Sequence, residues 1–259
     1  MTGCRRVLAL LVACTASPVL LPAQEATTVW ERSLELSGNY LYGNTDQAIL
    51  SFRSGVARND STVALRVDTR FLIGVTDREN EGRVMDRRSW VLSGSVDFHQ
   101  YARQSQFLFG SVEQSLELRI DRRVSGGIGE KIIVVNDSVS KVDVSLGVLG
   151  EQSILPEAPN TGALVRPSNN RSLVRLSGRL RYRRNLTSRV GVDHVTFYRP
   201  EISAFNRYLA SSVSALSYSV GKNTNLRLSL QNDFDSLARS RGSRSNQNGQ
   251  LLVGANTKF

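Results

Sequence analysis

Cysteine and histidine are almost absent from this chain. Its 259 residues include two cysteines, Cys4 and Cys14, and two histidines, His99 and His194. Both cysteines precede Ala23, so a chain cleaved after that residue has neither a disulfide framework nor a cysteine-based metal site. His, Asp and Glu nowhere cluster with the spacing of metal ligands, and we expect no cofactor.

Compact runs of lysine and arginine are also missing, although the chain is basic. It carries 33 Lys and Arg against 23 Asp and Glu, a net charge of +10. Without basic runs interleaved with aromatic residues, nucleic acid is not an expected partner. For an exported protein, the anionic partners to expect are lipopolysaccharide phosphates or an anionic solute.

The first 23 residues are typical of a cleaved secretory signal. Arg5 and Arg6 precede an apolar stretch from Val7 to Ala16, and Ala23 is a small residue at a plausible cleavage point. We therefore expect a signal peptide over 1–23 and one mature domain over 24–259, in which 31 basic residues against 23 acidic residues give a net charge of +8. The alternative is lipoprotein processing at Cys14, because the residues before it resemble a lipobox.

The mature chain lacks helix-period segments and alternates with period two in stretches of about ten residues. This pattern predicts about twelve strands, with ten as the alternative. The expected strands are Trp30–Tyr42, Gln47–Arg58, Thr62–Val75, Ser89–His99, Ser105–Gln114, Arg122–Val135, Lys141–Glu151, Arg171–Arg183, Thr187–Tyr198, Arg207–Val220, Asn225–Asp233 and Asn246–Phe259.

Each clear strand has one apolar face and one polar, highly charged face. Burying several arginines in a dry core would be very costly, whereas a water-filled barrel lumen accommodates them. We expect the following charged residues to line the lumen: Arg66, Asp68, Arg70, Asp97, Asp143, Arg175, Arg179 and Arg181. The apolar faces would then contact lipid, with aromatic residues at the membrane interfaces.

The connections and the last residue favour the same fold. Tight turns, as at Asn136–Ser138, alternate with links expected to be longer, over Thr76–Arg88, Gln152–Asn170, Arg199–Asn206 and Asp235–Gln247. The last strand ends on Phe259, which is typical of the signal that outer-membrane barrels present to their assembly machinery. The predicted fold is an all-β, antiparallel, up-and-down transmembrane barrel in the bacterial outer membrane, in contact with lipid and lipopolysaccharide.

Several motifs resemble those of one family. They are Trp30–Gly38 followed by Tyr42-Gly-Asn-Thr-Asp46, then Gly126–Gly129 and Val144–Glu151. Together they resemble the salt-induced outer-membrane proteins, domain of unknown function 481. The resemblance implies an outer-membrane barrel with a connection to salt or osmotic stress, and it assigns no catalytic residues.

The expected function is non-enzymatic, either a structural barrel or a narrow channel. Two other classes stay open: a barrel hydrolase that uses His99 or His194 with a nearby serine, and a secreted β-sandwich that binds a ligand. The arginine ladder of Arg171–Arg183 could line an anion-preferring pore or pair with acids and plug the lumen. Arg239, Arg241 and Arg244 are candidate lipopolysaccharide contacts, or else belong to a solvated loop.

Overall fold

The computed structural model describes residues 29–41, 46–60, 62–78, 82–155 and 170–258. These residues form twelve strands and one short 3-10 helix. The strands are β1 (Val29–Leu41), β2 (Asp46–Asn59), β3 (Val63–Arg78), β4 (Gly82–Phe98), β5 (Gln104–Ser115), β6 (Ile120–Asn136), β7 (Ser140–Ile154), β8 (Asn170–Asn185), β9 (Val190–Glu201), β10 (Ala204–Ser219), β11 (Thr224–Asp235) and β12 (Gln247–Lys258), and the helix η1 is Arg239–Arg241. No helix in these segments has the length and apolar character needed to cross a membrane.

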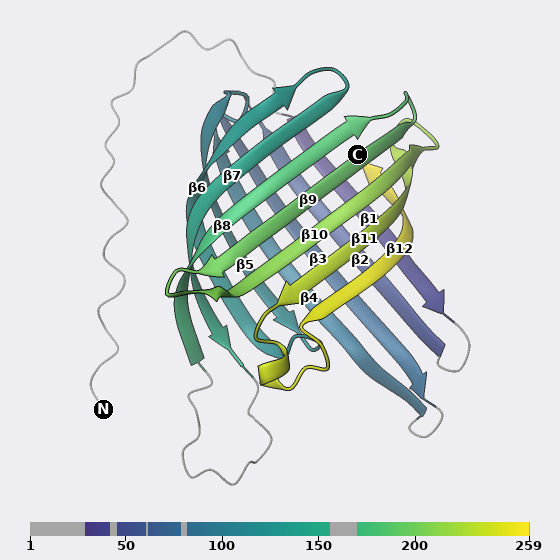
Figure 1. The fold of residues 1–259 in the computed structure, drawn as a ribbon. Coiled ribbons are helices and arrows are strands. Elements are labelled where there is room, and N and C mark those ends of the chain that lie inside the picture. The colour runs from purple at the N-terminus through teal and green to yellow at the C-terminus, as the bar shows by residue number, and fades with distance from the viewer. Residues whose placement is uncertain (1–28, 42–45, 61, 79–81, 156–169, 259) are drawn as a thin grey trace.

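The strands close into a single antiparallel barrel in which each strand pairs with its neighbours in the chain (Figure 1). The ring is completed between β1 and β12 by a short pairing from Ser33 with Lys258 to Gly38 with Val253. The predicted fold class is therefore confirmed. The alternatives of ten strands and of a β-sandwich are wrong, because the described strands number twelve and the sheet has no open edge.

The two faces of the barrel have opposite chemistry. Large apolar side chains such as Leu36, Ile128 and Val253 are exposed on the outside, whereas Glu35, Ser37 and other polar residues are buried inside. This distribution is the inverse of that in a water-soluble protein, which buries most large apolar side chains and keeps its exposed apolar patches small. It suits a barrel with hydrocarbon outside and water inside. Some buried side chains are apolar, and among them Ile49, Leu72 and Leu252 form a small cluster.

The connections alternate between the two ends of the barrel. At one end, here called the turn end, lie the connections β2–β3, β4–β5, β6–β7, β8–β9 and β10–β11. At the other, the loop end, lie β1–β2, β3–β4, β5–β6, β7–β8, β9–β10 and β11–β12.

Two connections at the loop end are much shorter than predicted. The link expected over Thr76–Arg88 is mostly strand, since β3 and β4 remain paired up to Arg78 and Gly82, with a bulge near Gly74. The link expected over Arg199–Asn206 is reduced to two residues between Glu201 and Ala204. Polar composition misled the prediction in both places, because a strand that extends beyond the hydrocarbon pairs its backbone without needing an apolar face.

Some predictions lie outside the described residues. These are the signal peptide over 1–23 with cleavage after Ala23, the lipoprotein alternative at Cys14, and the terminal Phe259. Most of the Gln152–Asn170 link also lies outside them.

Candidate functional site in the barrel lumen

A cavity of about 1240 Å³ occupies the interior of the barrel. Its wall runs from turn-end residues such as Thr187 and Arg189 to Glu113, Leu118 and Asp235 near the loop end. Among the described residues, eleven basic and seven acidic side chains line it. They are Arg53, Arg66, Arg70, Arg123, Arg179, Arg181, Arg183, Arg189, Arg199, Arg227 and Lys258, with Glu35, Asp68, Asp97, Glu113, Asp193, Asp233 and Asp235. The described wall therefore carries a formal net charge of +4.

Six of the eight residues predicted to face the lumen line this cavity: Arg66, Asp68, Arg70, Asp97, Arg179 and Arg181. Most have a partner of opposite charge, as in Arg66 Nε with Asp68 Oδ2 at 3.1 Å and Lys131 with Asp97 at 3.7 Å. The other two predicted residues are buried in the wall behind the cavity. Asp143 pairs with Arg179 at 3.4 Å, and Arg175 Nε donates to Glu151 Oε2 at 2.8 Å.

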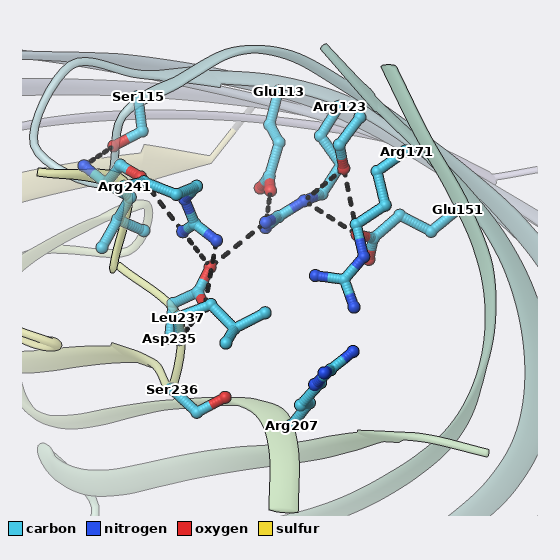
Figure 2. Close-up of polar contacts among 12 residues, drawn as sticks. Glu113, Ser115, Arg123, Glu151, Arg171, Arg207, Asp235, Ser236, Leu237 and Arg241 are labelled. Atoms are coloured by element: carbon cyan, nitrogen blue, oxygen red, sulfur yellow. Dashed lines mark hydrogen bonds and ion pairs between the residues drawn. The ribbon is translucent and has the colours of Figure 1, made fainter. Parts of the chain in front are cut away.

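A buried ion network lies at the loop end of the cavity and is centred on Arg123 of β6 (Figure 2). The Arg123 guanidinium is 2.7 Å from Glu113 Oε1, 3.3 Å from Glu151 Oε1 and 3.2 Å from Asp235 Oδ2. The side chains of Arg123, Glu151 and Asp235 are each at most 7% exposed. Three carboxylates on three other strands thus offset the cost of burying one guanidinium.

The β11–β12 loop joins this network and reaches the opposite wall. Arg241 Nη2 lies 2.5 Å from Asp235 Oδ2 and donates to the carbonyl oxygen of Leu118 at 3.1 Å. Ser243 Oγ donates to the carbonyl oxygen of Glu117 at 2.8 Å. Since Glu117 and Leu118 belong to the β5–β6 turn, these contacts fold the loop across the lumen and narrow its loop end. We call Arg123, Asp235 and Arg241 the latch.

The latch was only partly anticipated from the sequence. Alternation is weak in the expected strand Arg122–Val135, and Asp235 begins the expected link Asp235–Gln247, so the sequence predicts neither Arg123 nor Asp235 to face the lumen. Arg241 was predicted as a lipopolysaccharide contact, but here its guanidinium is engaged inside the barrel. Arg239 and Arg244 are exposed on the same loop, where their predicted contact with lipopolysaccharide stays a prediction.

The two histidines lie apart from the cavity. His194 shares the outward-facing side of β9 with Tyr198, and its Nδ1 is 2.8 Å from Ser214 Oγ while its Nε2 is 2.7 Å from Thr196 Oγ1. His99 is exposed in the β4–β5 turn, with a left-handed backbone at φ 52°. The hydrogen bonds of His194 thus go to two hydroxyl groups rather than to a carboxylate that would orient it as a catalytic base. In the described part of the chain, no group of three or more His, Cys, Asp or Glu side chains is placed to hold a metal ion.

Comparison with known proteins agrees with this architecture. No relative matches among proteins of curated function. The COG4313 outer membrane channel from Pseudomonas putida F1 has a similar structure, with a TM-score of 0.50 and 9% identity over 95% of this chain and 100% of that chain. The KdgM porin aligns with a TM-score of 0.46 and 13% identity over 88% of this chain and 99% of that chain.

The first of these structures shows a shared fold, that of an outer-membrane barrel. The family resemblance suggested by the sequence motifs is confirmed, because the model of one family matches residues 34–249. The chain belongs to the family described as "Protein of unknown function, DUF481".

Proposed function

We propose that this protein is an outer-membrane channel for small anionic solutes, restricted at its loop end by the latch. The observation that carries the proposal is the charged cavity, in which eleven basic side chains face seven acidic ones. A purely structural barrel would be filled by packed side chains, whereas this one encloses a cavity of about 1240 Å³.

The excess of positive charge supports a preference for anions. Low-dielectric walls focus the field of the charges they enclose, so that a small net excess raises the local concentration of counter-ions. The cations also extend along the barrel, from Arg189 and Lys258 near the turn end to Arg53 and Arg199 deeper in the cavity. An anion that enters from the turn end therefore meets arginines throughout its path.

Planar-bilayer recording of the purified barrel tests the proposal. With a potassium chloride gradient, the reversal potential should have the sign of an anion-preferring pore. The double variant Arg181→Glu with Arg189→Glu removes the formal net charge of the described wall, and we expect its reversal potential to move close to zero. Arg244→Glu, on the exposed part of the β11–β12 loop, is the control and should leave the reversal potential unchanged.

Two results would contradict the proposal. The first is a cation preference in the unmodified protein. The second is an absence of conductance both in that protein and in a variant whose latch has been broken by Asp235→Asn, since this outcome would indicate a structural barrel without a conducting path.

The proposal includes a location and partners. The exposed apolar belt would lie in outer-membrane lipid, Arg239 and Arg244 would contact lipopolysaccharide phosphates, and Phe259 would be read by the barrel assembly machinery. Fractionation of cells should recover the protein with outer membranes, and it should migrate anomalously on unboiled gels. Recovery as a dissolved periplasmic protein would refute this location. A connection to salt or osmotic stress stays a prediction from the family resemblance.

A further inference from the structure

Two arginines face each other directly on adjacent strands of the lumen wall. Arg53 of β2 is in register with Arg70 of β3, and both side chains line the cavity. Like charges directly opposite each other on a sheet repel and destabilise the pairing. A third cation, Arg227 of β11, lines the cavity close to them and adds to the positive charge around Arg53.

The acidic residues nearby do not neutralise this group of arginines. Glu35 lies 3.6 Å from Arg227 Nε, and it is opposite Arg53 in the pairing of β1 with β2. Asp233 accepts a hydrogen bond from Gln231 Nε2 at 2.8 Å. Three guanidinium groups therefore face two carboxylates, and one positive charge is left without a counterpart.

Hydrogen-bonding capacity is also unused at this place. Arg53 Nη2 donates to the neutral Gln231 Oε1 at 2.9 Å, and within the described residues no carboxylate lies within ion-pair distance of Arg53. The Nε atoms of Arg53 and Arg227 are both buried and have no hydrogen-bond partner. Buried donors without partners are costly, and an ion that offers acceptor oxygens at this place would remove that cost.

We propose that Arg53, Arg70 and Arg227 form a binding site for a tetrahedral oxyanion, a sulfate or phosphate group, in the wall of the lumen. Sulfate carries two negative charges at neutral pH and phosphate carries between one and two, and each presents several acceptor oxygens. The guanidinium fork matches this geometry with parallel charge-assisted hydrogen bonds, which chloride cannot reproduce. The site deepens the proposed function, on which it rests because solutes must reach the lumen.

The experiment is calorimetric titration of the purified, refolded full-length barrel with sodium sulfate and with sodium phosphate at constant ionic strength. We expect saturable binding with one site per chain. In Arg70→Gln, binding should weaken by about tenfold or more, since a charged hydrogen bond and a neutralising charge are lost. Arg70→Lys keeps the positive charge but lacks the guanidinium fork. Its affinity for sulfate should therefore lie between that of the unmodified protein and that of Arg70→Gln.

Arg66→Gln is the matched control. Arg66 lies on the same strand and the same cavity wall, but its Nε is already paired with Asp68 at 3.1 Å. Its loss should leave sulfate affinity within about twofold of that of the unmodified protein, because the proposed donors are intact. Anomalous gel migration of each variant verifies that the barrel has closed.

Absence of saturable binding in the unmodified protein would overturn the site, and so would equal weakening in Arg70→Gln and Arg66→Gln. Failure of the site and failure of the channel are distinguishable. An anion-selective conductance without sulfate binding would refute only the proposed binding site. Sulfate binding without conductance would refute the proposed channel and still support the binding site.

Discussion

Asp235 and Arg123 lie 3.2 Å apart, although they stand on β11 and β6, with four strands between them on the shorter way round the ring. Their contact is therefore made across the lumen and not along the wall. It is strengthened by Arg241, whose guanidinium joins the same carboxylate. The width of the described loop end consequently depends on a few ionic contacts, and these can be removed one at a time.

Loss of the Asp235 charge should open the loop end. Asp235→Asn leaves Arg123 and Arg241 without a shared anion, and we expect higher single-channel conductance together with a loss of about 3 kcal/mol in the free energy of unfolding. Bilayer recording and urea unfolding measure the two effects. The control is Arg244→Gln on the same loop. Unchanged conductance in Asp235→Asn would show that the latch does not restrict the path.

Arg175 and Arg181 should differ in what they control, although both belong to the predicted arginine ladder. Arg175 is paired with Glu151 inside the wall, and both side chains are at most 4% exposed. Arg175→Ala should thus destabilise the barrel by about 3–5 kcal/mol with little change in ion preference. Arg181→Ala should shift the reversal potential with a smaller effect on unfolding. Reversed outcomes would contradict the positions assigned to these two residues.

Closure of the ring should depend on Gly254. A Cβ atom at this position would lie 2.2 Å from the carbonyl oxygen of Leu36 and 2.6 Å from Ser37 Cα, both backbone atoms of the partner strand β1. Gly254→Ala should cost about 1–3 kcal/mol and raise the fraction of unclosed chain on unboiled gels. Gly150→Ala is the control, because a Cβ there would meet no atom within 4 Å. If the two variants had equal stability and equal fractions of unclosed chain, the close contact of Gly254 with β1 would not be needed for closure.

The turn carboxylate of Asp60 should make stability depend on pH. Backbone N–H groups of Val63 and Thr62 donate to Asp60 Oδ1 at 2.6 and 3.0 Å and lower the pKa of this carboxyl in the folded state. Its stabilising effect is then present above the unfolded pKa, about 3.9, and is lost as the pH falls through the lower folded value.

Unfolding of the unmodified protein and of Asp60→Ala, followed from pH 7 to pH 2, measures this effect. The difference in stability should be largest near neutral pH and shrink toward pH 2. Asp60→Asn keeps an acceptor oxygen without the charge, so its own stability should lack this contribution to the pH dependence. A difference between Asp60→Ala and the unmodified protein that stays constant with pH would contradict the lowered pKa.

The histidines should be dispensable for conduction. His194 lies on the outer face and His99 in a turn, so His194→Ala with His99→Ala should leave conductance and ion preference unchanged. A barrel hydrolase would instead lose turnover of a phospholipid substrate in the same variant. Measurable lipid hydrolysis that disappears with His194→Ala, but not with His99→Ala, would favour the enzymatic alternative.

The barrel fold was predictable because apolar and polar residues alternate along each strand when one face of the strand meets lipid and the other meets water. Successive side chains of a strand point to opposite faces, so the alternation around residue 35 predicts an outer and an inner face. The structure has Leu34 and Leu36 on the outer face and Glu35 and Ser37 on the inner face. The strand ends were less predictable. Beyond the hydrocarbon, both faces meet water, so alternation fades while the pairing of Thr76 with Val84 continues.

The residues that line the cavity were predictable only where the periodicity of a single strand determines which side chains face the lumen. Arg66 and Asp68 followed from their alternation with apolar neighbours. The latch did not, because a contact between Arg123 and Asp235 depends on the number of strands and the path of the β11–β12 loop, neither of which is encoded in a local pattern. The opposition of Arg53 and Arg70 likewise depends on the register of one hairpin, which a shift by one residue would abolish.

The Arg123 network also has a consequence for the order of assembly. Its carboxylates come from β5, β7 and β11, so the network is complete only when strands far apart in the chain have taken their places in the same ring. Whichever strands pair first, Arg123 lacks the Asp235 counter-charge until β6 and β11 face each other across the lumen. A chain truncated before β11 would therefore leave Arg123 with only the carboxylates of Glu113 and Glu151.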